Sequence, residues 1–227
     1  MNDALNNLNI FIDHSILHSD ATEAEVRKTC EEARNWRFHS VVVNPIWVPL
    51  VRYDLRHSTV KVVTVCGFPL GANRTDIKVA EAMKAVSDGA QEIDMVANIG
   101  WLQAGDYSAA GEEIAEIKRR IPFNIMLKVI IECGLLSEEK QVEATKMVID
   151  SGAQFIKTST GFFGGVTVEQ VQRIAKVVNR QIEIKAAGGI RTAELCGHLL
   201  EAGAQRLGCS TSVEIMRSLG LKQSSQN

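Results

Sequence analysis

The stretch Ser151–Ser159, SGAQFIKTS, contains the two features that decide the fold: a glycine turn and the start of an apolar run. The same turn recurs as DGAQ at Asp88–Gln91 and as AGAQ at Ala202–Gln205. Each copy follows an amphipathic segment and precedes a β-branched run. A glycine just past a helix and just before a strand is typical of a helix-to-strand turn. The sequence therefore predicts equivalent turns in different units of one repeating architecture.

Short apolar runs predict the strands, and several are apolar almost throughout, as in VKVVTVCG and NIMLKVII. Such continuous apolar character is typical of parallel strands that are covered on both faces. The eight predicted strands are Ile10–Asp13, Ser40–Asn44, Val60–Cys66, Gln91–Val96, Asn124–Glu132, Gln154–Ser159, Gln181–Ala187 and Gln205–Cys209.

Amphipathic segments between these runs predict the helices. Thr22 and Ser137 are expected N-caps, because acidic residues follow each of them in the first turn. The predicted helices are Thr22–Trp36, Thr75–Asp88, Tyr107–Arg120, Ser137–Ser151, Thr167–Val178 and Thr192–Glu201.

The alternation of strands and helices predicts a single (β/α)8 TIM barrel. No linker or low-complexity segment separates the units, so we expect one domain over residues 1–227. The alternative is an open doubly wound sheet, which often carries a glycine fingerprint after its first strand. Here DHSIL follows that strand, which favours the barrel.

Composition excludes several classes of function. The 227 residues carry a net charge of −2, and the 25 lysines and arginines are scattered, so no basic surface for nucleic acid is expected. No apolar stretch approaches the roughly 18 residues that span a bilayer, and no secretory signal precedes the first strand. The five widely spaced cysteines suggest reduced thiols rather than disulfides or a metal site. We therefore expect a cytoplasmic protein without a membrane partner.

Lysines late in the apolar runs are the strongest candidates for chemistry, because active-site groups of a barrel lie at the carboxyl ends of its strands. Lys128, Lys157 and Lys185 occur in three consecutive predicted strands. A buried ammonium is costly unless it is paired or loses its proton. An unprotonated amine attacks carbonyl groups, and a second cation nearby favours that state. Lys157 and Lys185 are therefore a candidate Schiff-base lysine and its partner.

Asp94, near the end of the fourth predicted strand, could transfer protons while a carbinolamine loses water and an enamine forms. Its alternative role is an ordinary ion pair with a lysine. Lys128 likewise has two possible roles, because a lysine in the barrel interior can serve only to pair with a carboxylate such as Asp94 or Glu132.

Small residues gather after the last three predicted strands, in GFFGG (Gly161–Gly165), AAGGI (Ala186–Ile190) and GCSTS (Gly208–Ser212). Loops at this place in a barrel commonly bind phosphate through backbone N–H groups and hydroxyls. The alternative is that these glycines serve only the turns.

Several motifs resemble those of the deoxyribose-phosphate aldolase family, in its order and spacing: IDHSIL, GFPLGAN, EIDMVANIGWLQAGDY, FIKTSTGF, IKAAGGIRT and RLGCSTS. The resemblance covers nearly the whole chain. It implies a class I (Schiff-base) aldolase, a lyase that reversibly cleaves 2-deoxy-D-ribose 5-phosphate to acetaldehyde and D-glyceraldehyde 3-phosphate without metal or cofactor. It also implies Lys157 as the Schiff-base lysine, Lys185 as its partner and Asp94 as the proton relay. The implied substrate and phosphate contacts are Asp13, Lys128, Thr158, Gly161, Gly188, Gly189, Ser210 and Thr211.

The departures from the family pattern gather at the phosphate end. The segment after FIKTST is one residue shorter than usual, Ala187 replaces a serine, and Cys209–Ser212 replaces TSSG. The tail LKQSSQN also lacks the tyrosine with which family members often end. Losing one hydroxyl from a charge-assisted site costs about 1.5–3 kcal/mol.

Two alternatives to the leading function remain, and the departures motivate the first of them. The same lysine chemistry could serve a different, non-phosphorylated aldehyde, or the barrel could bind a sugar phosphate without catalysis. Either a monomer or a homodimer is compatible with the fold and the resemblance.

Overall fold

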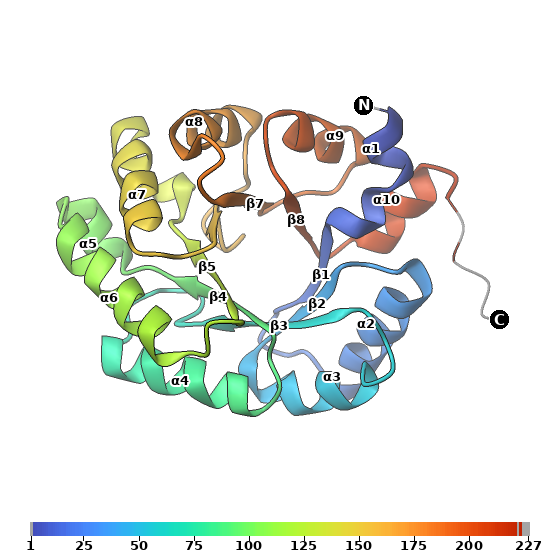
Figure 1. Ribbon diagram of the computed structural model, residues 1–227. Coiled ribbons are helices and arrows are strands. Elements are labelled where there is room, and N and C mark those ends of the chain that lie inside the picture. The colour runs from blue at the N-terminus through green and yellow to red at the C-terminus, as the bar shows by residue number, and fades with distance from the viewer. Residues whose placement is uncertain (1, 222, 224–227) are drawn as a thin grey trace.

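The computed structural model describes residues 2–221 and 223, and these form a closed barrel of eight parallel strands inside a ring of helices (Figure 1). Each strand pairs with the next in sequence, and β8 closes onto β1. The predicted TIM barrel is therefore confirmed, and an open sheet is excluded. The strands are β1 Ile12–Ile16, β2 Ser40–Val43, β3 Lys61–Cys66, β4 Glu92–Val96, β5 Met126–Ile130, β6 Phe155–Lys157, β7 Glu183–Ala187 and β8 Arg206–Cys209.

All six predicted helices agree with the structure to within one residue at either end. They are α2 Glu23–Trp36, α4 Thr75–Ser87, α6 Tyr107–Arg120, α7 Glu138–Asp150, α8 Val168–Val178 and α9 Ala193–Glu201. Thr22 and Ser137 are N-caps as predicted, accepting from the backbone N–H groups of Glu25 and Lys140. Within the described residues, no helix combines the length and apolar character needed to cross a membrane.

Four further helices escaped the sequence reasoning: α1 Asn2–Asn6, α3 Val48–Asp54, α5 Ile99–Ala104 and α10 Ser212–Ser218. Single 3-10 turns at Leu8–Phe11, Pro45–Trp47 and Cys133–Leu135 were also missed. None of the four helices exceeds seven residues, which is about two turns and too short for a helical period to stand out.

The first strand is the one element whose predicted position was clearly wrong. The prediction was Ile10–Asp13, whereas β1 covers Ile12–Ile16 and a 3-10 turn occupies the residues before it. The polar residues within IDHSI interrupt the apolar run, so the predicted strand ended too early, at Asp13. In the barrel these polar side chains have partners, because His14 bonds to Glu32 and Asp13 accepts from Ser40.

The three GAQ turns share one hydrogen-bond pattern, which explains why the glutamine recurs. The glycine of each turn has a positive φ. The glutamine then bonds the preceding strand twice, accepting a backbone N–H on its side chain and donating its own backbone N–H to the carbonyl of the same residue. The residues bonded in this way by Gln91, Gln154 and Gln205 are Val62, Leu127 and Ile184. Each turn therefore ties a new strand to its neighbour at the amino end of the barrel.

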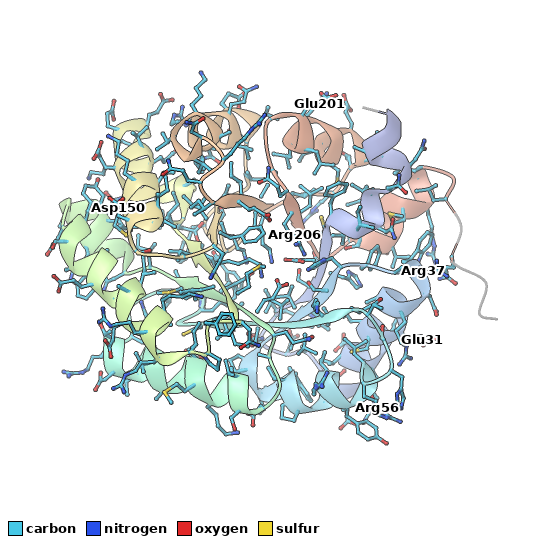
Figure 2. All side chains as sticks on the ribbon, in the orientation of Figure 1. Glu31, Arg37, Arg56, Asp150, Glu201 and Arg206 are labelled. Atoms are coloured by element: carbon cyan, nitrogen blue, oxygen red, sulfur yellow. The ribbon has the colours of Figure 1, made fainter. Side chains whose placement is uncertain are left out.

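The barrel interior divides into an apolar part and a charged part. Val42, Val63 and Val65, from β2 and β3, form a small cluster separate from the main core between strands and helices. The other strands contribute buried charged side chains instead. Arg206 is one of them, and Figure 2 shows it at the centre of the barrel while Glu31, Asp150 and Glu201 lie at the periphery.

Candidate active site

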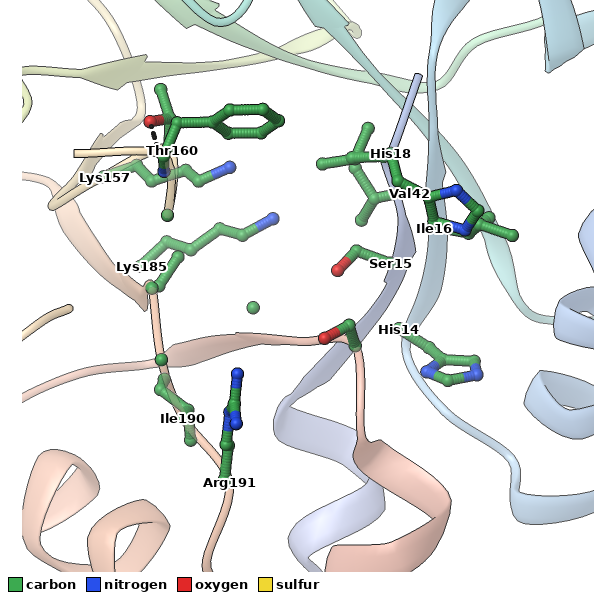
Figure 3. A pocket seen from close by; sticks show the side chains of 18 of the residues that line it. His14, Ser15, Ile16, His18, Val42, Lys157, Thr160, Lys185, Ile190 and Arg191 are labelled. Carbon is green, nitrogen blue, oxygen red and sulfur yellow. Dashed lines mark hydrogen bonds between the residues drawn. The ribbon is translucent and has the colours of Figure 1, made fainter. Parts of the chain in front are cut away.

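A cavity of about 540 Å³ opens where the strands end, and both lysines of the predicted pair line it. Lys157 and Lys185 extend side by side into this cavity from β6 and β7 (Figure 3). Ser15 and Val42, from β1 and β2, lie on the opposite side (Figure 3). The cavity therefore places two amines against a wall that is partly apolar.

Strand register explains why the two lysines lie at the same depth. Lys157 and Lys185 are directly paired neighbours in the β6–β7 ladder. Their Nζ atoms lie 2.9 and 2.7 Å from the same oxygen, Oδ2 of Asp94. All three side chains are buried. The structure thus brings together the three residues that were predicted as the catalytic group.

The environment of Lys157 favours its neutral amine. Burial lowers the pKa of Lys157 to about 8, and the ammonium groups of Lys185 and Lys128 add to this decrease, while the Asp94 carboxylate opposes it. At pH 7 roughly a tenth of this amine is therefore unprotonated, the form that attacks a carbonyl, compared with well under a thousandth for an ordinary lysine.

Asp94 remains ionised between its lysine neighbours. Burial by itself would raise its pKa, but Lys128, Lys157 and Lys185 outweigh this effect and hold the pKa of Asp94 well below its ordinary range. Lys128 reaches the second oxygen, with Nζ 3.0 Å from Oδ1. Asp94 therefore holds three cations in place from the centre of the barrel.

One of the two roles predicted for Lys128 was to pair with a carboxylate, and the structure shows this pairing. Its partners are Asp94 and Glu92, whose Oε2 lies 2.5 Å from Nζ, whereas Glu132 bonds to Thr160 instead. Burial would lower the pKa of Lys128, but Asp94 and Glu92 together raise it. Lys128 is thus a buried permanent cation beneath Asp94, outside the cavity lining.

Asp13 belongs to the same ion-paired group. Its carboxylate lies 2.5 Å from the Nζ of Lys185 and 3.4 Å from Nη1 of Arg206, and it accepts a hydrogen bond from Ser40. Burial opposes ionisation, yet Lys185, Lys128 and Arg206 lower the pKa of Asp13. Like Asp94, it lies beneath the cavity and can act on a substrate only through Lys185.

We call the seven ion-paired side chains inside the barrel the core charge cluster: Asp13, Glu92, Asp94, Lys128, Lys157, Lys185 and Arg206. All seven are buried. The cluster holds three carboxylates and four basic groups, so it is electrically balanced only when one basic group is neutral. A buried net charge is costly. Lys157 contacts one carboxylate oxygen of the cluster and shares it with Lys185. Its positive charge is therefore the least compensated among the three lysines.

The glycine loops meet at one side of the cavity. Gly161, Gly188, Gly189 and Ser210 line it, and Val166 donates its backbone N–H to the carbonyl of Gly188, joining two of the loops. Two other predicted contacts lie outside the lining. Thr158 bonds the backbone of Ala187, and Thr211 donates to the carbonyl of Ile190. These two threonines hold the loops from behind.

Gly208 makes room for Lys185 on β8. A Cβ atom at this position would lie 2.9 Å from the Cβ of Ala187 and 3.3 Å from the Cε of Lys185. The first distance is shorter than carbon atoms tolerate, so the strand needs glycine there. The same contact accounts for the small side chain of Ala187, which faces Gly208 in the β7–β8 ladder.

His14 contacts Ser212 in the segment after β8 that departs from the family pattern. Nδ1 of His14 lies 2.9 Å from the hydroxyl of Ser212, and Nε2 lies 3.0 Å from Glu32. His14 therefore links β1 to this segment and to α2 through hydrogen bonds. The tail that departs from the family pattern lies largely outside the described residues.

Sequence reasoning missed Arg191 in the cavity lining and Glu92 in the core charge cluster. Arg191 lines the cavity beside the glycine loops and points toward it (Figure 3). Its position directly after GGI in a loop predicted to bind phosphate could have revealed it. Glu92 was missed as well, although residues two apart on a strand face the same side, so EIDMV places both of its carboxylates in the interior.

The cysteines are buried free thiols, as predicted. Burial raises the pKa of Cys30 and of Cys133 to about 12, which keeps both thiols protonated. Within the described part of the chain, His, Cys, Asp and Glu side chains nowhere gather in threes suited to a metal ion.

A family model and individual relatives point to the same family of proteins. The model of the DeoC/LacD family aldolases matches residues 8–210. A deoxyribose-phosphate aldolase of Natranaerobius thermophilus is 46% identical over 94% of this chain and 98% of its own. Another, from Brevibacillus brevis, is 46% identical over 92% of this chain and 95% of its own.

Solved structures agree with the sequence relatives. The aldolase QR15 superposes with a TM-score of 0.90 at 39% identity, over 94% of this chain and 96% of its own. Deoxyribose phosphate aldolase from Aeropyrum pernix, described as a tetramer, has a TM-score of 0.89 at 28% identity, over 96% and 93% of the two chains. This chain therefore belongs to the DeoC/LacD family of aldolases.

Proposed function

We propose that this chain is a class I aldolase that reversibly cleaves 2-deoxy-D-ribose 5-phosphate to acetaldehyde and D-glyceraldehyde 3-phosphate, with Lys157 as the Schiff-base lysine. The observation that carries the proposal is the pair of buried amines on one oxygen of Asp94, one of which has a pKa of about 8. The shared name of relatives that match over 90% of the chain supports the substrate.

The first step forms the covalent bond. The neutral Nζ of Lys157 attacks C1 of the open-chain aldehyde, and the resulting carbinolamine loses water to give an iminium ion. Lys185, beside Lys157, donates a proton to the departing hydroxyl. Asp94 accepts and returns protons, directly or through water, because it contacts both amines.

The second step breaks the C2–C3 bond. A base removes the proton from the C3 hydroxyl, the C3–O bond becomes a carbonyl, and the electrons of the C2–C3 bond pass into the enamine on Lys157. D-glyceraldehyde 3-phosphate then leaves. Protonation of the enamine at C2 and hydrolysis release acetaldehyde and restore the amine. These steps require no metal or cofactor.

The phosphate group fits the glycine-loop side of the cavity. Gly161, Gly188, Gly189 and Ser210 line this side, and Arg191 adds a cation. Backbone N–H groups, a hydroxyl and a guanidinium together make a suitable anion site. Thr158 and Thr211 hold these loops from behind, whereas Asp13 and Lys128 belong to the ion-paired group beneath the two lysines.

The alternatives carried from the sequence are weaker. A preference for a non-phosphorylated aldehyde is not favoured, because the relatives are named for the phosphorylated sugar and Arg191 offers a cation for its phosphate. A non-catalytic barrel would be expected to lack a catalytic residue, and Lys157, Lys185 and Asp94 are all present.

We further propose that residues 1–227 form a single TIM-barrel domain, and that the protein acts in the cytoplasm and forms a homodimer. Five free thiols suit a reducing compartment. Exposed apolar side chains on neighbouring segments, Ile46, Tyr53, Ile77 and Met83, suit contact with a second copy. Light scattering at a range of concentrations measures the assembly, and a monomer throughout would contradict the dimer.

Trapping tests the proposed nucleophile. Acetaldehyde and borohydride should add one ethyl group to the peptide that contains Lys157, and Lys157→Ala should abolish both the adduct and the cleavage of deoxyribose 5-phosphate. Lys176→Ala, which removes an exposed lysine, is the matched control and should change neither. An adduct on another lysine, with Lys157 unmodified, would refute the proposal.

A further inference from the structure

We infer that Glu92, at the amino end of the barrel, is a positioning residue for the aldolase reaction. It holds Lys128 against Asp94 and thereby sets the charge balance around Lys157 from the side of the barrel opposite the substrate. The inference rests on the proposed role of Lys157 and adds a residue that touches neither the cavity nor the reacting atoms.

An unbroken series of contacts connects the two ends of the barrel. Lys157 meets Oδ2 of Asp94 at 2.9 Å, and Oδ1 of Asp94 meets Lys128 at 3.0 Å. Lys128 then lies 2.5 Å from Oε2 of Glu92, and Oε1 of Glu92 lies 3.2 Å from Nε2 of His39. The His39 side chain is 25% exposed, so this series ends in solvent at the far end.

Strand geometry keeps the series in place. Glu92 and Asp94 lie two residues apart on β4, so both point into the barrel, and Asp94 is the direct ladder partner of Lys128 on β5. Phe155 covers one side, with its ring centre 5.9 Å from Nζ of Lys128 and 5.7 Å from Cζ of Arg206. The lysine therefore has little freedom to move away from the two carboxylates.

Charge balance gives Glu92 its effect on Lys157. Within the core charge cluster, Glu92 is one of three carboxylates facing Lys128, Lys157, Lys185 and Arg206. The groups that face Lys157 itself are Asp94, Lys185 and Lys128, from β4, β7 and β5. Removing the charge of Glu92 leaves Lys128 with Asp94 as its one remaining carboxylate partner in the core charge cluster and makes the interior more positive. The neutral form of Lys157 should then persist to lower pH.

The size of the effect follows from Coulomb's law. Glu92 is on the order of 10 Å from the reactive amine, and at that distance one charge in a protein interior shifts a titration by roughly one pH unit. If Glu92 served folding alone, removing its charge would reduce the stability of the protein and leave the titration of Lys157 unchanged.

The test measures the titration of Lys157 by its reaction with acetic anhydride over a range of pH, read by mass spectrometry of the Lys157 peptide. Glu92→Gln keeps the side-chain shape and should move the midpoint down by roughly one pH unit. Glu183→Gln is the matched control, because Glu183 also begins a strand at the amino end but is exposed and outside the cluster. An unchanged midpoint in a folded Glu92→Gln protein overturns the inference.

A second variant covers the case in which Glu92→Gln does not fold. His39→Lys places a permanent cation beside Glu92 at a partly exposed position and should shift the midpoint in the same direction. No shift, or an upward shift, overturns the inference.

Borohydride trapping on the parent protein keeps the two proposals distinct. A shifted midpoint without an acetaldehyde adduct on Lys157 refutes the proposed function alone, and an adduct without a shift refutes the role of Glu92 alone.

Discussion

At the scale of single residues, the lowered pKa of Lys157 is a property of its surroundings. The side chain is buried, and it forms an ion pair with Oδ2 of Asp94, the oxygen that Lys185 also contacts. Desolvation and the second cation thus act in the same direction on its pKa. The sequence showed that two lysines would be adjacent, and the fold determined that they compete for one carboxylate oxygen.

The activity of the parent protein should follow the neutral fraction of Lys157. Because its pKa is about 8 and the neutral amine reacts, imine formation should rise with pH through 8 and fall about tenfold for each unit below it. In Lys185→Met the loss of a cation raises the pKa of Lys157, so trapping near neutral pH should drop about tenfold and recover partly at higher pH. Lys176→Met is the control. Equal losses at every pH would contradict this account.

Arg191 should matter for phosphate and not for the sugar. Removing a charge-assisted contact costs about 1.5–3 kcal/mol, so Arg191→Gln should raise KM for deoxyribose 5-phosphate about tenfold to a hundredfold. Turnover of deoxyribose without phosphate should not change. Arg180→Gln, at an exposed arginine near the opposite end of the barrel, is the control. A similar loss with both sugars would place Arg191 outside the phosphate site.

At the scale of elements, the recurring GAQ turn joins each new strand to the preceding one. The glycine provides the positive φ, and the glutamine bonds the neighbouring strand through both side chain and backbone. The repeat was recognisable in the sequence, but the function of its glutamine was not, since the bonded residue lies 21 to 29 positions upstream.

Gln154→Ala should weaken the barrel without harming the site. The backbone N–H of Leu127 loses its acceptor, at a cost of about 1–2 kcal/mol in the free energy of unfolding measured in urea. Activity at low denaturant should persist, because the turn lies at the end away from the cavity. Gln172→Ala, on the exposed face of α8, should change stability by less than about 0.5 kcal/mol. Equal effects in both variants would exclude a special role for the turn.

At the scale of the whole molecule, the core charge cluster links strands that are far apart in sequence. Asp94 alone contacts Lys128, Lys157 and Lys185, which lie 34 to 91 residues away. Breaking such a group leaves buried charges without partners. The charged interior of the barrel therefore accompanies a lowered pKa of Lys157, and the carboxylates of the cluster are expected to contribute to stability.

Asp94→Asn should be strongly destabilising. Removing one partner of a buried ion pair costs about 3–5 kcal/mol, measured by urea unfolding near neutral pH. The variant should gain stability as pH rises, because its uncompensated lysines release protons more readily in the folded than in the unfolded state, so that the unfolded chain binds more protons. Glu143→Gln, which breaks an exposed pair with Lys146, should cost less than about 1 kcal/mol. A flat stability–pH profile in Asp94→Asn would contradict the charge argument.

The sequence by itself determined the barrel, the bounds of its long helices and the family of aldolases, because periodicity, turn glycines and ordered motifs are local signals. It also identified Lys157, Lys185 and Asp94, since charged residues inside apolar strands are unusual. Only the tertiary structure decided that Lys128 lies beneath Asp94, that β1 begins two residues later, that Arg191 lines the cavity and that Glu92 pairs with Lys128. The physical reason is distance along the chain: a pKa or an ion pair depends on side chains that meet only when the barrel closes.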